Sequence, residues 1–88
     1  MPFPPHAADM IRAKLDAGIL PTKIGGKMYA GYGRHAPCDG CETPILPAQV
    51  EYEFNSPEGT TVRFHLGCAG LWEAVLRQRG INPRDNSN

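Results

Sequence analysis

The fold of this chain is decided by two short segments, Cys38-Asp39-Gly40-Cys41 and His65-Leu66-Gly67-Cys68, with residues 42–64 between them. Together they read C-x2-C…H-x2-C. Two ligands separated by two residues can reach one metal ion from a single tight turn, and structural zinc sites bind four Cys or His ligands tetrahedrally. The spacing therefore predicts one structural zinc ion, held by Cys38, Cys41, His65 and Cys68.

Local features around both segments favour this site. Gly40 tolerates backbone angles that let amide N–H groups point at the thiolate sulfurs. The second segment lies where a predicted strand ends and a predicted helix begins, and a helix start offers free N–H groups and partial positive charge. Three thiolates, a neutral imidazole and Zn²⁺ carry a net negative charge, so we expect the helix start to stabilise the site.

Other interpretations of these residues remain open at this point. Cys38 and Cys41 could form a redox pair, but such pairs usually open a helix within a β-α-β unit, which the sequence does not suggest. Cys68 could be a small buried hydrophobic residue with His65 on the surface. His35 could replace His65 as a ligand, although its spacing is less suitable. Two pairs at ligand spacing, on either side of a predicted hairpin, favour the metal site.

The chain is short for a self-sufficient core. It has 88 residues, of which 41% are hydrophobic, with 9 Pro and 10 Gly, a composition typical of one globular domain with many turns. Domains of this size usually add a disulfide or a metal, and an odd cysteine count of 3 favours the metal. No signal peptide or membrane span is visible, so we expect a reducing, cytoplasmic location.

Hydrophobic periodicity predicts two helices, at residues 7–17 and 67–79. In the first, Ala8, Ile11 and Leu15 share one face. In the second, Trp72 lies on the same stripe as Cys68. Each helix is followed by Gly-Ile-x-Pro, in which Gly18 and Gly80 supply left-handed caps and the proline prevents continuation.

A β-hairpin is predicted at residues 49–54 and 61–65 because apolar and polar residues alternate in both and turn residues separate them. Val50, Tyr52 and Phe54 share one face, and Glu51 and Glu53 share the other, where Arg63 is expected to face them. The glycine-rich residues 22–37 are expected to be extended and loop-rich, with a possible short strand at 27–30.

This combination resembles a treble-clef zinc finger. The spacing is also similar to the first zinc site of LIM domains, as is Phe64-His65-x-x-Cys68, but a helix bearing Trp72 follows in place of a second cysteine set. The segments Cys-Asp-Gly-Cys, Val-Glu-Tyr-Glu, Phe-His-x-x-Cys and Leu-Trp-Glu-Ala are similar to small uncharacterised bacterial zinc-finger proteins. The resemblance covers residues 38–79 and implies a fold and a metal, without a settled activity.

The expected fold is α+β, a small zinc-stabilised treble-clef-like domain with a zinc knuckle, a β-hairpin and a C-terminal helix. Residues 38–83 would form the finger core, and residues 1–37 an N-terminal helix and glycine-rich segment packed on it. Residues 1–5 and 84–88 are expected to be loose ends.

The function expected is a non-enzymatic binding module. Four protein ligands leave zinc no open position for a substrate or water, and no nucleophile–base set accompanies them. The formal net charge is zero, with bases concentrated in residues 17–38 and acids in residues 39–58, which suits a protein partner better than a membrane or a small-molecule substrate. Trp72 and Tyr52 could anchor such a partner, although their patterns are more typical of core residues.

Nucleic-acid binding is the alternative function. Basic and aromatic residues interleave within residues 23–35, where they could track phosphates and stack on bases. The candidate set is Lys23, Lys27, Tyr29, Tyr32 and Arg34. The same segment could equally be a loop that wraps the metal site with solvated charges, which the neutral net charge favours.

Overall fold

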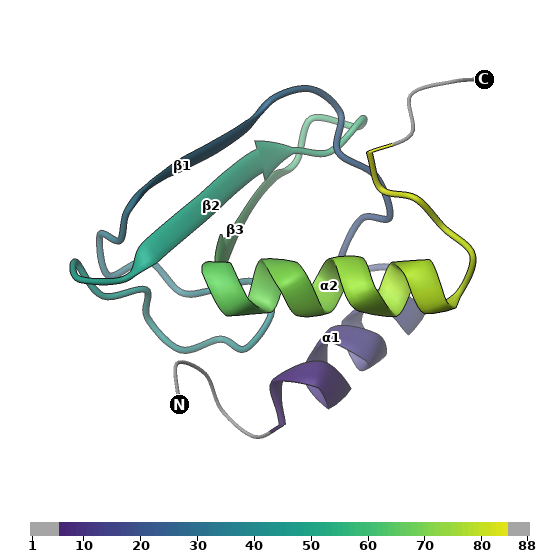
Figure 1. The fold of residues 1–88 in the computed structure, drawn as a ribbon, viewed down its shortest axis with the longest axis horizontal. Helices are drawn as coiled ribbons and strands as arrows, with labels where there is room; N and C mark the ends of the chain where they lie inside the picture. The colour runs from purple at the N-terminus through teal and green to yellow at the C-terminus, as the bar shows by residue number, and fades with distance from the viewer. Residues whose placement is uncertain (1–5, 85–88) are drawn as a thin grey trace.

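The computed structural model describes residues 6–84, which form two helices and one three-stranded antiparallel sheet (Figure 1). The order along the chain is α1 (Ala7–Asp16), β1 (Met28–Tyr32), β2 (Val50–Asn55), β3 (Thr61–His65) and α2 (Leu66–Gln78). The small α+β fold is therefore confirmed. Within residues 6–84, no helix is long and apolar enough to cross a membrane.

The two expected loose ends fall almost wholly outside the described residues. Of residues 1–5 and 84–88, only Arg84 is described, and its Nε lies 2.7 Å from Glu73 Oε2 on α2.

Both helices end in the manner that their sequences predict. Gly18 and Gly80 have φ angles of 75° and 77°, which is the left-handed region that favours glycine. Beyond each glycine the Ile N–H turns back to the helix, from Ile19 to the Lys14 carbonyl and from Ile81 to the Leu76 carbonyl, both at 2.9 Å. These bonds satisfy carbonyls that would otherwise lack a partner at the helix end.

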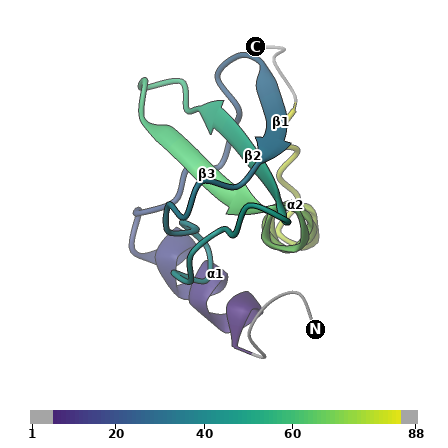
Figure 2. The same cartoon turned by 90° about the vertical axis from the view of Figure 1, so that its left-hand side faces the viewer.

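α1 packs against α2 through a narrow apolar stripe. Ala7, Ile11 and Leu15 are its buried residues. The sequence placed Ala8 on this face, but Ala8 is only partly buried. Ala7 fits better because it stands four residues before Ile11, as Ile11 stands four before Leu15. In Figures 1 and 2 alike, the upper part of the sheet lies above α2 and α1 lies mostly below it.

The glycine-rich segment contributes a full third strand. β1 pairs with β2 in a register that runs from Met28 opposite Phe54 to Tyr32 opposite Val50. The predicted short strand at 27–30 is thus confirmed in part: it begins one residue later, at Met28, and continues to Tyr32. No alternation marked it in the sequence because four of its five residues are exposed and only Met28 is partly buried.

The core lies between the sheet and α2. Rings of Phe54, Phe64 and Trp72 meet there with centroids 5.1–6.1 Å apart, and Trp72 is fully buried. Its indole Nε1 donates a hydrogen bond of 2.9 Å to the Pro21 carbonyl, which ties the loop after α1 to the core. Trp72 is therefore a core residue, as its place on the helix stripe favoured.

Candidate metal centre

Four Cys and His side chains from three parts of the chain meet at one point. The ligand atoms of Cys38, Cys41, His65 and Cys68 all lie within 4.8 Å of one another, and all four residues are buried. A tetrahedral site with sulfur about 2.3 Å from zinc places its ligands roughly 3.8 Å apart. One ion fits this cluster after a small contraction, and the cluster could therefore hold a metal.

The turn that carries the first pair is closed by its own backbone. The Glu42 N–H donates to the Cys38 carbonyl at 2.8 Å and the Cys38 N–H donates to the Thr43 carbonyl at 2.9 Å. Glu42 has a φ angle of 71°, so the left-handed residue of this turn is not a glycine. We call residues 38–43 the knuckle.

Gly40 is needed for space, and this differs from the conformational reason expected from the sequence. Its N–H does point at Cys38 Sγ, at 3.4 Å, but it is not among the residues with positive φ. A Cβ at this position would lie 3.2 Å from Ile11 Cγ1 and 3.3 Å from Cys68 Cβ. The knuckle, α1 and α2 therefore approach so closely that an alanine here would require its neighbours to shift by a few tenths of an ångström.

His65 is oriented by a hydrogen bond on the side of its ring away from the cluster. Its Nδ1 lies 3.4 Å from Cys41 Sγ, and its Nε2 lies 3.2 Å from the Pro44 carbonyl. A carbonyl can only accept, so Nε2 carries the proton and Nδ1 keeps its lone pair for a metal. His35, the alternative ligand, is exposed and is not part of the cluster.

The main-chain N–H groups of Gly40 and His65 donate to Cys38, each 3.4 Å from its sulfur. The His65 residue directly precedes α2, and Cys68 lies in its first turn. The cluster therefore sits at the start of α2, as the sequence predicts, and N–H groups there offset thiolate charge.

The thiols perturb one another in the absence of a metal. The hydrogen bond with Cys68 lowers the pKa of Cys38 to about 4, against the effect of burial, and N–H groups of Cys41, His65 and Gly40 contribute. The same contact raises the pKa of Cys68, and burial and the charges of Cys38 and Cys41 raise it further. Three crowded thiolates are unfavourable on their own, and a divalent cation would remove this penalty.

Asp39 joins the knuckle to β3, a role that the sequence pattern does not predict. Its N–H donates to the Arg63 carbonyl at 2.7 Å, and its Oδ2 accepts from the Arg63 N–H at 2.8 Å. Lys14 of α1 adds a second link, because its Nζ donates to the Asp39 carbonyl and lies 2.9 Å from Glu42 Oε2. An Asp beside the first cysteine was the only sequence signal for these contacts.

On the same side of the sheet as His65, two arginines enclose the hairpin glutamates. Arg63 lies 3.8 Å from Glu51 and 3.6 Å from Glu53, as the alternation predicted. Arg34 reaches the same two carboxylates at 3.3 and 3.5 Å. Glu51 is only 5% exposed, and its Oε1 has no hydrogen-bond partner among the described residues.

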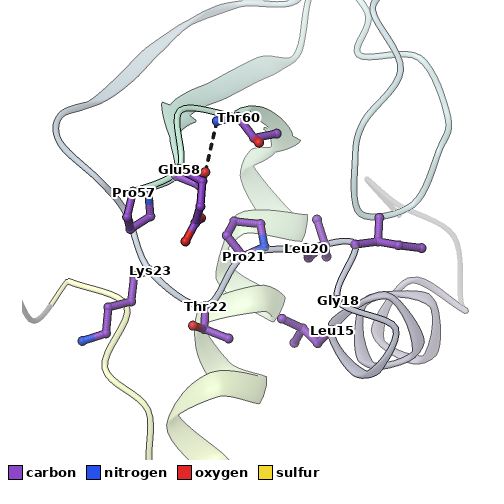
Figure 3. Close-up of a pocket in the computed structure, with 11 residues that line it drawn as sticks. Leu15, Gly18, Leu20, Pro21, Thr22, Lys23, Pro57, Glu58 and Thr60 are labelled. Atoms are coloured by element: carbon purple, nitrogen blue, oxygen red, sulfur yellow. Dashed lines mark hydrogen bonds between the residues drawn. The ribbon is translucent and has the colours of Figure 1, made fainter.

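The two aromatic residues of the candidate nucleic-acid set do not share one face of the sheet. Tyr29 and Tyr32 are three positions apart on β1, so they point to opposite faces of the sheet. Arg34 is engaged with Glu51 and Glu53. Lys23 lines an open groove that lies beside the turn between β2 and β3 (Figure 3).

That groove has a volume of about 630 Å³, and none of the four clustered Cys and His residues lines it. Residues from the loop after α1 and from the β2–β3 turn line it, including Leu20, Pro21, Pro57 and Glu58 (Figure 3). The smaller hollow, of about 280 Å³, touches His65, and its other lining residues are Gln49, Val50, Leu66 and Gly67. His65 is the only one of the four clustered residues that lines either hollow.

Comparisons with family models, with curated proteins and with solved structures find no match for this chain.

Proposed function

We propose that this protein is a non-enzymatic binding module built around one structural zinc ion, in a treble-clef-like arrangement, and that it acts by binding another protein. The observation that carries the proposal is the cluster of Cys38, Cys41, His65 and Cys68. Three thiolates and an imidazole in a four-ligand set are the donors that structural zinc sites use.

A structural role is favoured over a catalytic one by the number and burial of the ligands. Catalytic zinc usually has three protein ligands and an open position for water. Here four side chains converge, and none of the four ligand residues is more than 4% exposed. The larger groove lies away from them, so a substrate would have no direct approach to the ion through it.

Metal binding would stabilise the fold of the whole domain. The ligands connect the knuckle, the end of β3 and the first turn of α2. Structural zinc in small fingers contributes about 10–16 kcal/mol near neutral pH, whereas a core of this size rarely supplies more than about 3–5 kcal/mol net. The free energy of unfolding would therefore depend mainly on the ion.

A protein partner is supported by the character of the surface. The formal net charge is zero, and the exposed large hydrophobic residues include Tyr29, Tyr32 and Leu66. Tyrosine is enriched at protein interfaces because it combines a large apolar ring with a polar group. Because Tyr29 and Tyr32 point to opposite faces of the sheet, a partner would contact both of them by binding along the open edge of β1.

The metal part of the proposal is tested by elemental analysis and native mass spectrometry of protein purified without added metal. We expect one zinc per chain and a shift to the apo mass after chelation. Another resident metal, or no metal at all, would refute it.

The binding part is tested with an affinity capture that compares the native protein with a Tyr29→Ser/Tyr32→Ser variant. The variant leaves the metal ligands intact and should retain zinc, but it should lose the captured partner. Equal capture by both proteins would rule out the edge of β1 as the binding site. Binding to RNA or DNA that falls steeply with added salt would instead favour the nucleic-acid alternative.

A further inference from the structure

One edge of the sheet is covered by another part of the chain, and the other edge is open. In β3, the outer edge is occupied: Asp39 bonds both backbone groups of Arg63, and the His65 N–H points to Cys38 Sγ. The knuckle thus covers this edge. β1 forms the other edge, and within residues 6–84 no strand pairs with its outer side.

The hydrogen-bond pattern shows which backbone groups β1 leaves open. The Gly33 N–H donates to the Gln49 carbonyl at 2.9 Å, in line with the register of β1 on β2. Bonded pairs alternate along an antiparallel ladder, so Tyr29 and Gly31 bond to β2. Met28, Ala30 and Tyr32 therefore direct their N–H and C=O groups away from the sheet.

Nothing in this strand protects its edge from pairing. Natural proteins usually block an open edge with charged residues, proline or a bulge. The five residues of β1 are Met, Tyr, Ala, Gly and Tyr, and the nearest charge in sequence is Lys27, outside the strand. Two large aromatic side chains stand exposed on it, Tyr29 at 63% and Tyr32 at 76%.

We propose that β1 pairs antiparallel with β1 of a second copy of this chain, about a two-fold axis at Ala30, and so forms a continuous six-stranded sheet. This inference rests on the proposed function, because the edge exists only in the folded, metal-loaded domain. Under this inference, the protein that binds β1 is a second copy of the same chain.

The register about Ala30 is self-complementary in both backbone and side chains. Met28 falls opposite Tyr32 of the second copy, Ala30 opposite Ala30, and Tyr32 opposite Met28. Each of these three pairs forms two hydrogen bonds, which gives six bonds across the axis. The bonds use the backbone groups that β2 leaves open. On one face each Tyr29 ring lies over Gly31 of the second copy, which has no side chain to obstruct it. On the other face each Tyr32 lies beside a Met28 thioether, a favourable contact.

Pairing in any neighbouring register would lose part of this match. A shift by one residue along the strand would bring inward-directed groups of Tyr29 or Gly31 to the interface, where they are already bonded to β2. Lys27 falls opposite Gly33 of the second copy, beyond the last bonded pair, so no charge is buried. Ala30 is thus the only position in the strand that meets its own copy directly.

That property defines the test, which uses sedimentation velocity on the metal-loaded full chain from about 10 μM to 1 mM, the range in which weak homodimers form. Wild-type protein should shift from monomer to dimer across this range. Ala30→Lys and Ala30→Glu place like charges directly opposite across the axis, and each should weaken dimerisation by about tenfold or more. An equal mixture of the two variants should restore it, because only heterodimers then pair opposite charges.

Gln78→Lys, an exposed change on α2, is the matched charge control and should dimerise like the wild type. Ala30→Pro removes only an outward N–H and should also be monomeric, since proline is tolerated on the open side of an edge strand. The proposal would be overturned if the wild type stays monomeric to 1 mM. It would also be overturned if the Ala30→Lys or Ala30→Glu variant dimerises alone, or if the mixture of the two does not dimerise.

Metal content and circular dichroism of the same samples separate this outcome from failure of the proposed function. Folded, zinc-loaded, monomeric protein would overturn the pairing alone. Unfolded protein without bound metal would overturn both.

Discussion

The contact between Gly40 and Ile11 offers a quantitative test of how α1 is joined to the metal centre. In Gly40→Ala the new Cβ would lie 3.2 Å from Ile11 Cγ1 and 3.3 Å from both Ile11 Cδ1 and Cys68 Cβ. Ile11 and Cys68 are fully buried, so neither can move aside without disturbing its own neighbours. Overpacking of this kind costs about 1–3 kcal/mol.

Ile11→Ala removes both of the isoleucine atoms that the new methyl group would meet. On its own, this change should cost about 2–5 kcal/mol, because it leaves a cavity where α1 meets the knuckle. In the Ile11→Ala background the cost of Gly40→Ala should fall, since both isoleucine contacts are gone and only the contact with Cys68 Cβ, at 3.3 Å, remains. The coupling free energy between the two changes is therefore expected to be about 1–2 kcal/mol, part of the overpacking cost.

Urea unfolding of the four proteins at saturating metal, followed by circular dichroism, measures this coupling. Equal metal content in all four must be verified, so that the free energies of unfolding refer to the same state. If the two substitutions prove additive, α1 does not pack on the knuckle as described. A Gly40→Ala protein as stable as the wild type would lead to the same conclusion.

Three further changes have defined expectations. Cys68→Ser should bind metal far more weakly and give a circular dichroism spectrum like that of the chelated wild type. Lys14→Met should lower the free energy of unfolding by about 1–3 kcal/mol, measured in urea, because it leaves the Asp39 carbonyl without its charged donor. Arg34→Met/Arg63→Met should cost about 3–5 kcal/mol by stranding the buried carboxylate of Glu51, and adding Glu51→Gln should recover much of that loss.

The four clustered ligands were predictable because their signal is local. Each pair, Cys38 with Cys41 and His65 with Cys68, lies within one turn of chain, and short-range spacing is sufficient to indicate a shared metal. The helix ends at Gly18 and Gly80 were predictable for the same reason, since a cap depends on the residues next to it.

The contacts made by α1 around the knuckle were not predictable from the chain alone. Lys14 contacts the carbonyl of Asp39, and Ile11 lies next to Gly40, although these residues are far apart in the sequence. Hydrophobic periodicity predicts a helix but does not predict which distant turn the helix will contact. β1 was only partly visible, because an exposed edge strand lacks the alternation that burial imposes. The partner of Asp39 on β3 likewise depends on how the knuckle docks, which no local pattern specifies.

The central claim is that one metal ion holds the knuckle, β3 and α2 together. The most direct measurement is a thermal melt of the native protein, followed by far-ultraviolet circular dichroism, before and after removal of the metal with a strong chelator. We expect a cooperative transition in the native sample, loss of most helical signal after chelation, and recovery when one equivalent of zinc is returned. An unchanged spectrum and melting temperature after verified removal of the metal would contradict the claim.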